Sequence, residues 1–367
     1  IINNGVTKLF CVPGGGCMIM QDAAIRSNVL NPICFHSEQA AVLAAEFYGR
    51  NSNCGIGIAM VTTGPGATNT VSSVTSAWLD SRPLIVILGQ VKSVDLNKNN
   101  NKIRAYGVQY VDTKSIFKGI SKEFIRLKDS DDITFQVKKA FNVAKSGRPG
   151  PVIIEVPLDL QSKKPFTKKN HNISIELKKI IKNKFLEKIN KKIIEKIFNK
   201  FIKSKRPIIL IGSGCVVDRV TQQTIRDLIS LLQVPIANSW GSLDLIEDNN
   251  PFYIGAPGTV GKRTANICVK NCDFILAIGN RIDLATTAYS PEKFGSQVKD
   301  FFVVDIDIHE LRIHKKLKRK IVNSGAKNFI SEFSEYSKIN IEKIEKNRFR
   351  KNEWIQFCKR IKLKFSE

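Results

Sequence analysis

The sequence predicts an α/β fold with two Rossmann-like domains, each built on a parallel sheet. Short apolar runs alternate with helical patterns along the first half of the chain, which is typical of βαβ units. Most of these runs end in Gly or Pro, and a second set of the same kind follows a basic stretch. A length of 367 residues is enough for two domains that each bury a sizeable core.

The first half holds five candidate strands and three candidate helices. The strands are apolar runs that lead into turns: Lys8–Val12, Pro32–Phe35, Gly55–Val61, Leu84–Leu88 and Val152–Val156. The helices carry apolar side chains at helical spacing: Ser37–Arg50, Ala67–Leu79 and Ile133–Lys145. Ligands bind beyond the carboxyl ends of the strands in an open α/β sheet, so we expect a site among the turns that follow these strands.

The second half repeats the pattern with four candidate strands and one candidate helix. The strands are Ile208–Ile211, Pro235–Ala237, Phe274–Ile278 and Phe301–Val304, and the helix is Thr221–Leu232. Beyond Leu311 the sequence is charged and has a helical pattern. We predict a first domain over residues 1–162, a basic linker over 163–189, a central domain over 190–330 and a helical linker over 331–367.

The formal net charge of +25 is concentrated in two segments. Residues 163–206 carry a net charge of +13 and residues 312–367 a net charge of +11, and both are rich in Lys, Ile and Asn. The first segment lacks the Arg clusters and interleaved aromatic residues of a nucleic-acid groove. Apolar residues recur at helical spacing between Lys191 and Lys200, which indicates an amphipathic surface helix. A nucleic-acid-associated basic protein is therefore a remote alternative, and we expect neither nucleic acid nor a membrane as partner.

Composition also indicates the cellular compartment that we expect for the protein. No apolar run approaches the ~18–20 residues that cross a bilayer, and the first five residues show neither an initiator Met nor a signal-peptide pattern. The eight cysteines form no Cys-x-x-Cys pair, and zinc-ligand spacing is absent. We expect buried thiols in a reducing cytoplasm, and the missing Met suggests that the sequence is a fragment.

Two turns in the first half contain candidate functional residues. Glu38 lies where a candidate strand gives way to a helix; with Ser37 as N-cap, Glu38 can be an ordinary first-turn acid favoured by the helix dipole. The string Gly64-Pro65-Gly66-Ala67-Thr68-Asn69 is rigid and open. A tight βα turn explains one of its glycines but not the whole string.

Two turns in the second half can each either bind a ligand or have a purely structural role. Gly212-x-Gly214 follows a strand and can cradle a phosphate, but it can equally be a strand-to-helix turn. Asp305-x-Asp307 can accept hydrogen bonds from a ribose or an adenine, or it can simply end its strand.

Seven motifs occur in one order along the chain. They are Pro13-Gly14-Gly15, His36-Ser37-Glu38-Gln39-Ala40-Ala41, Thr63-Gly64-Pro65-Gly66-Ala67-Thr68-Asn69, Asp80-Ser81-Arg82-Pro83, Gly89-Gln90, Gly107-Val108-Gln109 and Ser146-Gly147-Arg148-Pro149-Gly150-Pro151-Val152. Together they resemble thiamine-diphosphate-dependent enzymes of the acetolactate synthase type, in the large catalytic subunit. The resemblance covers residues 1–160 as the aminopyrimidine-binding domain and roughly 190–325 as the central domain.

The resemblance implies roles for four residues. Glu38 matches the glutamate that hydrogen-bonds N1′ of the aminopyrimidine and favours the imino tautomer, whose 4′-nitrogen removes the thiazolium C2 proton. Gln109 matches a substrate-facing glutamine, with a polar loop residue as the alternative. Gly14 and Gly15 match a loop close to the pyrimidine, where side chains would obstruct access. The implied reaction decarboxylates a 2-oxo acid and transfers the two-carbon or acyl unit to a second 2-oxo acid or an aldehyde.

The resemblance also implies FAD in the central domain, without a redox role in the main reaction. The matching positions are Arg148, Gly258, Thr259, Arg281, Asp305 and Asp307. Two departures leave a flavin-free member as the alternative. Pro257 stands where many members carry His, and Ile282–Ala285 lacks a second arginine of the family pattern.

Further implications concern parts beyond this sequence. The family binds Mg²⁺ and the diphosphate through a Gly-Asp-Gly…Asn motif in a third domain, and this motif is not in the sequence. We expect the Mg²⁺ ligands in such a C-terminal domain, with a non-catalytic truncated or binding homologue as the alternative. The resemblance further implies a homodimer or tetramer with the active site shared between subunits, and small 2-oxo acids as substrates.

Overall fold

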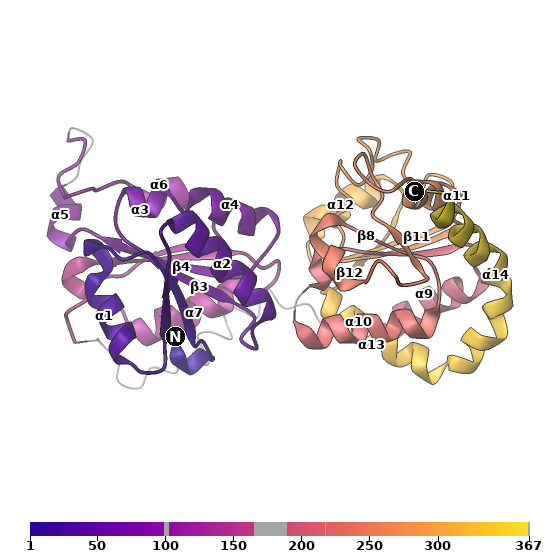
Figure 1. Cartoon of the computed structure of the whole chain (residues 1–367), viewed down its shortest axis with the longest axis horizontal. Coiled ribbons are helices and arrows are strands. Elements are labelled where there is room, and N and C mark those ends of the chain that lie inside the picture. Colours follow the sequence, from indigo (N-terminus) through magenta and orange to yellow (C-terminus); the bar gives the residue numbers. More distant parts are fainter. Residues whose placement is uncertain (99–102, 165–188, 217, 366–367) are drawn as a thin grey trace. The chain divides into compact units, whose positions relative to one another are not determined.

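The computed structural model describes residues 1–98, 103–164, 189–216 and 218–365 (Figure 1). The chain divides into two compact units, Ile1–Phe185 and Leu186–Glu367. Each unit contains one six-stranded sheet of parallel strands with helices on its faces, which confirms the predicted fold class. The linker predicted over 163–189 lies almost entirely outside the described residues. The other predicted boundaries stay predictions.

The sheet of the first unit has the strand order β2-β1-β3-β4-β6-β5. Its strands are β1 (Lys8–Cys11), β2 (Asn31–Cys34), β3 (Gly57–Val61), β4 (Leu84–Gln90), β5 (Glu123–Arg126) and β6 (Pro151–Pro157). Its helices are α1 (Met18–Arg26), α2 (Glu38–Asn51), α3 (Pro65–Thr68), α4 (Val71–Leu79), α5 (Ser93–Lys98), α6 (Thr113–Phe117) and α7 (Ile133–Lys145). Short 3-10 turns cover Ile2–Asn4, Gly15–Cys17 and Leu158–Leu160.

The central strands of this sheet are buried on both faces. Ile58 and Met60 of β3 belong to a core cluster shared with α1 and α7. Ala59 and Val61, which point to the opposite face, belong to a cluster shared with α2, α4 and α6 (Figure 1). Burial on both faces is why the predicted strands are continuous apolar runs rather than alternating ones.

The sheet of the second unit has the strand order β12-β11-β10-β7-β8-β9. Its strands are β7 (Pro207–Ile211), β8 (Ile236–Asn238), β9 (Tyr253–Gly255), β10 (Phe274–Ile278), β11 (Asp300–Asp305) and β12 (Lys320–Asn323). Its helices are α9 (Lys191–Lys203), α10 (Arg219–Leu232), α11 (Arg263–Asn271), α12 (Ile308–Lys316), α13 (Ala326–Ile339) and α14 (Ile341–Lys364). Short 3-10 turns cover Ser213–Cys215 and Trp240–Leu245.

The last helix is tied to the second unit by buried polar contacts. The indole Nε1 of Trp354 donates to the carbonyl of Pro207, at 3.0 Å. The buried ammonium of Lys351 donates to the carbonyl of Ile202 at 3.1 Å, and burial lowers the pKa of Lys351 to about 8. The residues predicted as a helical linker over 331–367 thus form the end of α13 and the whole of α14, with a turn at Asn340 between them, and pack on this unit.

Two sequence expectations were wrong in detail. The single helix expected over Ala67–Leu79 is two helices, because the backbone tightens at Thr70, whose N–H and hydroxyl both donate to the carbonyl of Ala67. The tail beyond Leu311 is not helical throughout, because β12 pairs with β11 at the edge of the sheet. Strands β5 and β9 were also not predicted.

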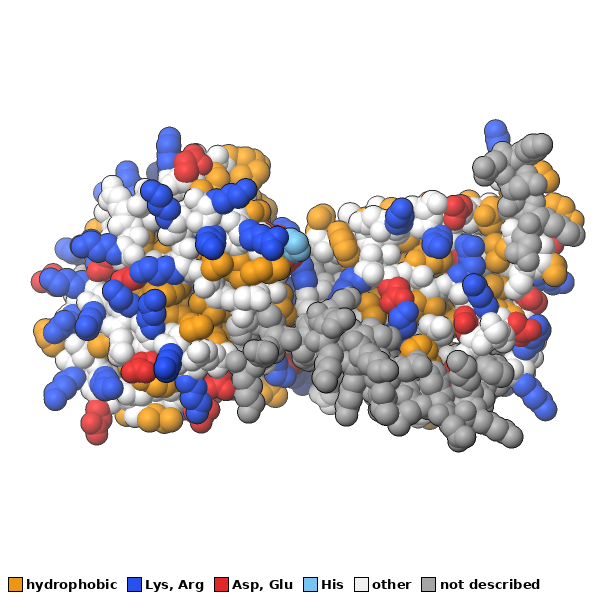
Figure 2. Space-filling model, turned by 180° about the vertical axis from the view of Figure 1, so that it is seen from behind, with side chains coloured by type: hydrophobic (Ala, Val, Ile, Leu, Met, Phe, Trp, Pro, Cys, Tyr) orange, Lys and Arg blue, Asp and Glu red, His pale blue; other side chains and the backbone are white. Residues whose placement is uncertain are grey.

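The surface and the cysteines agree in part with what the sequence predicts. No helix among the described residues is long and apolar enough to cross a membrane. All eight cysteines are free thiols and six of them are buried, but Cys34 is exposed, so the expectation of buried thiols is wrong there. On the described face of each unit in Figure 2, Lys and Arg side chains lie scattered among polar, acidic and apolar ones.

A buried histidine makes the stability of the second unit depend on pH. His314 on α12 is 3% exposed, and the guanidinium Nη1 of Arg319 lies 2.9 Å from its Nδ1. Burial and the adjacent Arg319 charge lower the pKa of His314 to about 4 from an ordinary 6.5. The unfolded chain therefore binds more protons than the folded chain between these two values, and stability falls as pH falls through them.

We expect wild-type protein to lose about 3 kcal/mol more stability than His314→Gln between pH 7 and pH 4. Glutamine keeps an acceptor for Arg319 but takes up no proton. Urea unfolding at several pH values measures the difference, and His309→Gln, at an exposed position on the same helix, is the matched control. Parallel pH profiles for wild type and His314→Gln would contradict the assignment.

Candidate functional site

The candidate site lies at the carboxyl edge of the first sheet. Strand β1 lies between β2 and β3, so the chain reverses its direction of travel across the sheet at the β1/β3 boundary. Such a switch point opens a crevice between the loops that follow the two strands. Those loops are Pro13–Gly16 after β1 and Thr62–Gly66 after β3.

The two loops are packed so closely that only glycine fits between them. A Cβ on Gly14 would overlap the Cβ of Thr62. The N–H of Gly16 donates to the Thr62 hydroxyl at 2.9 Å, which fixes the spacing of the loops. By contrast, a Cβ on Gly15 would meet no atom within 4 Å. The backbone at Gly15 is thus open to a ligand, whereas Gly14 is needed for the approach of the loops.

Glu38 reaches the same turn from the start of α2. Its Oε2 accepts a hydrogen bond from Nδ2 of Asn69 at 2.9 Å, and a Cβ on Gly66 would lie 3.3 Å from its Oε1. The side chain is partly exposed, and Ser37 as N-cap makes no side-chain hydrogen bond to the helix. The carboxylate therefore contacts the turn after β3, which a pure helix-capping role does not require.

Gln109 lies against the turn at Gly64. Gly64 has φ of +60°, and a Cβ there would overlap the carbonyl oxygen of Gln109. Gln109 itself has φ of +58°, a left-handed conformation that is uncommon for non-glycine residues. Its side chain is exposed. The structure thus brings Gly14, Glu38 and Gln109 close to residues 62–69, beside Thr62, Asn69 and Gly64 respectively.

A buried polar network holds the segment that carries Gln109. The fully buried carboxylate of Glu155 on β6 accepts from Nε2 of Gln90 at 2.9 Å, and also from the Thr113 hydroxyl and from Nε of Arg126. Nε2 of Gln90 also lies 3.5 Å from the carbonyl of Val111. Both Val111 and Thr113 follow Gln109 closely in sequence, so the network fixes the backbone just after it.

Sequence reasoning assigned no role to three residues of this arrangement. Thr62 and Asn69 position Gly16 and Glu38, but their contacts join residues 31 or more positions apart, which no local pattern reveals. Glu155 had a usable signal, because a glutamate inside a buried apolar strand is rarely found without partners around it.

The second unit has its own switch point, between β7 and β10. Relative to chain order, its strands follow the Rossmann order 3-2-1-4-5-6. The N–H of Gly214 donates to the carbonyl of Gly279 at 3.0 Å, and a Cβ on Gly212 would overlap that same carbonyl oxygen. The Gly212-x-Gly214 turn therefore packs on the end of β10, and the glycines there serve this close approach.

The predicted flavin positions of this unit lie on loops at the same edge. Gly258 has φ of +124°, and the N–H of Thr259 donates to the carbonyl of Ala285 at 3.1 Å. These contacts join the loop after β9 to the loop after β10, which contains the exposed Arg281. The N–H of Gly279 donates to the carbonyl of Val304 at 2.9 Å, next to Asp305 at the end of β11.

Asp305 and Asp307 both make local structural contacts. Oδ1 of Asp305 accepts from the N–H of Asp307 at 2.8 Å, and Oδ1 of Asp307 accepts from the N–H of His309 as the N-cap of α12. Arg148 belongs to the first unit, where it precedes β6 and its Nε donates to the Ser81 hydroxyl at 2.8 Å. No group of three or more His, Cys, Asp or Glu among the described residues could hold a metal ion.

Comparison with known protein families gives two matches. Residues 1–116 match the thiamine pyrophosphate enzyme N-terminal TPP binding domain, and residues 194–333 match the central domain of the same enzymes. The first match contains Gly14, Gly15, Glu38 and Gln109, and the second contains the predicted flavin positions other than Arg148.

Curated relatives point the same way. The chain is 29% identical to the acetolactate synthase large subunit of Cyanidium caldarium over 95% of its length, and 31% identical to that of Haemophilus influenzae over 90%. It is 32% identical to the chloroplastic acetolactate synthase 2 of Nicotiana tabacum over 85%. It spans about half the length of these relatives, namely 58%, 55% and 44%. With the two domain matches and the site geometry, this places the chain in the thiamine pyrophosphate enzyme family.

Proposed function

We propose that this chain supplies the aminopyrimidine-binding part and the central part of a thiamine-diphosphate-dependent carboligase of the acetolactate synthase type. The reaction would decarboxylate one 2-oxo acid and join the remaining unit to a second 2-oxo acid or an aldehyde. One observation carries the proposal. Gly14, Glu38 and Gln109, which lie far apart in sequence, all lie against residues 62–69 after β3.

The residues at this turn fit an aminopyrimidine ring. The backbone is bare at Gly15, and the Glu38 carboxylate is partly exposed and already oriented by Asn69. When bound, thiamine diphosphate supplies a carbon centre that adds to a carbonyl and accepts electrons on decarboxylation. Glu38 would share a proton with N1′ of the ring, which no residue with an amide or a shorter side chain can do.

Gln109 would orient the substrate beside this ring. Its backbone is held in a left-handed conformation by the Gly64 turn on one side and by the Glu155 network on the other. An exposed amide on a fixed backbone can donate to the carbonyl oxygen of a 2-oxo acid. The Mg²⁺ and diphosphate ligands would come from a part of the enzyme other than the described residues.

FAD would lie at the β7/β10 edge of the second unit. The Gly212-x-Gly214 turn, Gly258 and Arg281 line loops at that edge, where Rossmann sheets bind dinucleotides. Because Asp305 and Asp307 make capping contacts, their role would be to support the loops at this edge. We expect titration of the protein with FAD to change the flavin absorbance, with one site per chain. An unchanged spectrum and melting temperature at millimolar FAD would identify a flavin-free member.

Assembly as a homodimer or tetramer is part of the proposal. Apolar side chains project from the two helices beside the site, with Phe47 of α2 56% exposed and Leu79 of α4 56% exposed. A second copy covering these helices would bury both side chains. The free thiols also favour a reducing compartment such as the cytoplasm.

The test of the proposed function is product formation. Enzyme that includes the diphosphate-binding part should convert pyruvate to acetolactate and CO₂ when thiamine diphosphate and Mg²⁺ are supplied. Loss of this activity in Glu38→Gln, with cofactor binding retained, would support the proposed role of the carboxylate. A correctly folded enzyme that binds the cofactor but converts no 2-oxo acid would instead identify a non-catalytic homologue.

A further inference from the structure

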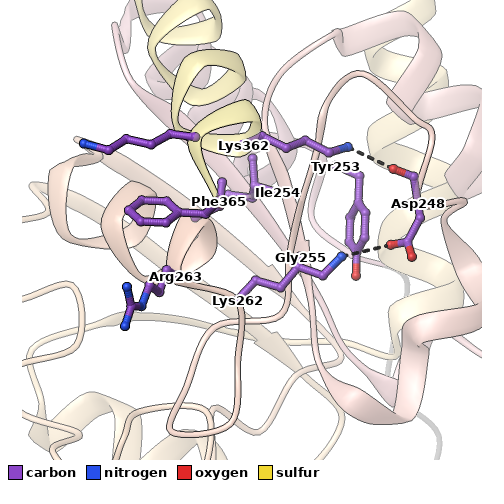
Figure 3. Close-up of a pocket in the computed structure, with 10 residues that line it drawn as sticks. Asp248, Tyr253, Ile254, Gly255, Lys262, Arg263, Lys362 and Phe365 are labelled. Carbon is purple, nitrogen blue, oxygen red and sulfur yellow. Dashed lines mark hydrogen bonds and ion pairs between the residues drawn. The ribbon is translucent and has the colours of Figure 1, made fainter. Parts of the chain in front are cut away.

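A pocket of about 570 Å³ lies in the second unit, next to the loop that carries Gly258 and Thr259 (Figure 3). It is formed by β9, the start of α11 and the end of α14. A volume of this size falls in the range of small-molecule sites, about 300–1,000 Å³. None of the residues to which thiamine diphosphate or FAD is assigned lines it. The pocket therefore needs an explanation of its own.

The lining carries a marked excess of positive charge. Four cationic side chains line it, namely Lys262 and Arg263 at the start of α11 and Lys362 and Lys364 at the end of α14. Asp248 is the single acidic residue among the lining residues. The excess positive charge is gathered in one concave place, where it attracts anions more strongly than scattered surface lysines do.

Two of the lysines converge on one aromatic ring. The ammonium groups of Lys262 and Lys362 lie 5.7 and 5.8 Å from the ring centroid of Tyr253 (Figure 3). Nζ of Lys262 lies 3.3 Å from Oδ1 of Asp248, and Nζ of Lys362 donates to the carbonyl oxygens of Asp248 and Asn250 at 2.9 and 3.2 Å. Burial and the nearby Lys262 lower the pKa of Lys362, as expected for two like charges held together.

The other side of the pocket combines a helix start with an aromatic group. Helix α11 has nine residues, and its N-cap Lys262 makes no side-chain hydrogen bond to the first turn. Arg263 and Thr264 of that turn line the pocket, so backbone N–H groups at the positive end of the helix lie close to it. Phe365 is 36% exposed, and the Arg263 guanidinium lies 5.8 Å from its ring centroid (Figure 3).

We propose that this pocket binds a phosphorylated small molecule of nucleotide size. Its phosphate groups would be held by Lys262 and Lys362, and a flat apolar part would lie against Phe365. Phosphate suits ammonium groups and helix N-termini alike, and the aromatic ring offers a stacking surface. The concave shape and limited volume favour a small ligand over a nucleic-acid strand, which needs an extended groove.

The test is calorimetric titration of the chain with ADP, pyrophosphate and adenosine. We expect ADP and pyrophosphate to bind and adenosine to bind far more weakly. The double variant Lys262→Gln/Lys362→Gln should bind pyrophosphate at least about tenfold more weakly, since each charged hydrogen bond contributes about 1.5–3 kcal/mol, or roughly tenfold or more. The matched control is Lys343→Gln/Lys346→Gln, which removes the same charge from exposed positions on α14.

Equal weakening in the two double variants would overturn the proposal, because it would mean non-specific attraction to a basic protein. Adenosine binding as tightly as ADP would overturn it as well. Repeating the pyrophosphate titration with saturating FAD separates this pocket from the β7/β10 edge. Unchanged affinity supports the pocket, whereas competition would assign the binding to the edge. Neither result depends on the carboligase activity, so the proposed function is tested separately.

Discussion

Glu38→Gln is expected to slow C2 proton exchange of bound thiamine diphosphate by about 10²–10⁴-fold, equivalent to roughly 3–5 kcal/mol of barrier. Glutamine keeps the size of the side chain and can still contact Asn69, whose Nδ2 donates to Glu38 Oε2 in the wild type. It cannot share a proton with N1′ of the aminopyrimidine. Cofactor should therefore still bind while the proton at C2 leaves slowly.

A purely structural role for Glu38 predicts a different result. A first-turn acid at a helix N-terminus stabilises its helix by about 0.3–1 kcal/mol and has no specific effect on proton transfer. The two roles thus differ in the size of the effect and in the quantity that changes. Glu310→Gln is a matched control, because Glu310 is a first-turn glutamate of α12 in the other unit.

The measurement is hydrogen–deuterium exchange at C2, followed by NMR after acid quench, together with the melting temperature. It needs enzyme that contains the diphosphate-binding part, since the cofactor must be bound. Slow exchange at an unchanged melting temperature is the expected outcome. A lowered melting temperature with wild-type exchange would leave Glu38 as a helix-capping residue and end its catalytic assignment.

Buried strands could be predicted from the sequence, and edge strands largely could not. The three strands that were not predicted, β5, β9 and β12, all lie at an edge of a sheet. β5 and β12 are partly exposed and read Glu-Phe-Ile-Arg and Lys-Ile-Val-Asn, without a continuous apolar run, whereas β9 is buried but only three residues long. β2 is also an edge strand, but its apolar Pro-Ile-Cys segment made it recognisable.

The candidate site also has parts that could be predicted from the sequence and parts that could not. Glu38, Gln109 and the glycines could be identified because they stand in motifs of contiguous residues. The contacts that hold them could not, since the Gln90–Glu155 contact spans 65 positions and depends on β4 pairing with β6. Motifs thus predict which groups meet a ligand. The packing that fixes their geometry becomes visible only in the folded chain.

Glu155 is the residue for which this packing predicts the largest effect on stability. Its carboxylate is fully buried at the centre of contacts from Gln90, Thr113 and Arg126. Removing one partner of a buried ion pair costs about 3–5 kcal/mol, because the other charge is left without compensation. The Arg126 side chain is 30% exposed rather than fully buried, so we expect the low end of this range, about 3 kcal/mol, for Glu155→Leu.

A local readout separates this network from general destabilisation. Because Thr113 and Val111 are held by the Glu155 and Gln90 side chains, Glu155→Leu should speed amide hydrogen exchange in residues 103–117 more than in β3. Glu123→Leu is the control: Glu123 pairs with Lys139 in a partly exposed ion pair on the neighbouring strand, which contributes about 0–1 kcal/mol. The double variant Glu155→Leu/Arg126→Met should recover part of the lost stability, since it leaves no uncompensated charge. Equal exchange in both segments of Glu155→Leu would mean that the network stabilises the unit as a whole and does not specifically position Gln109.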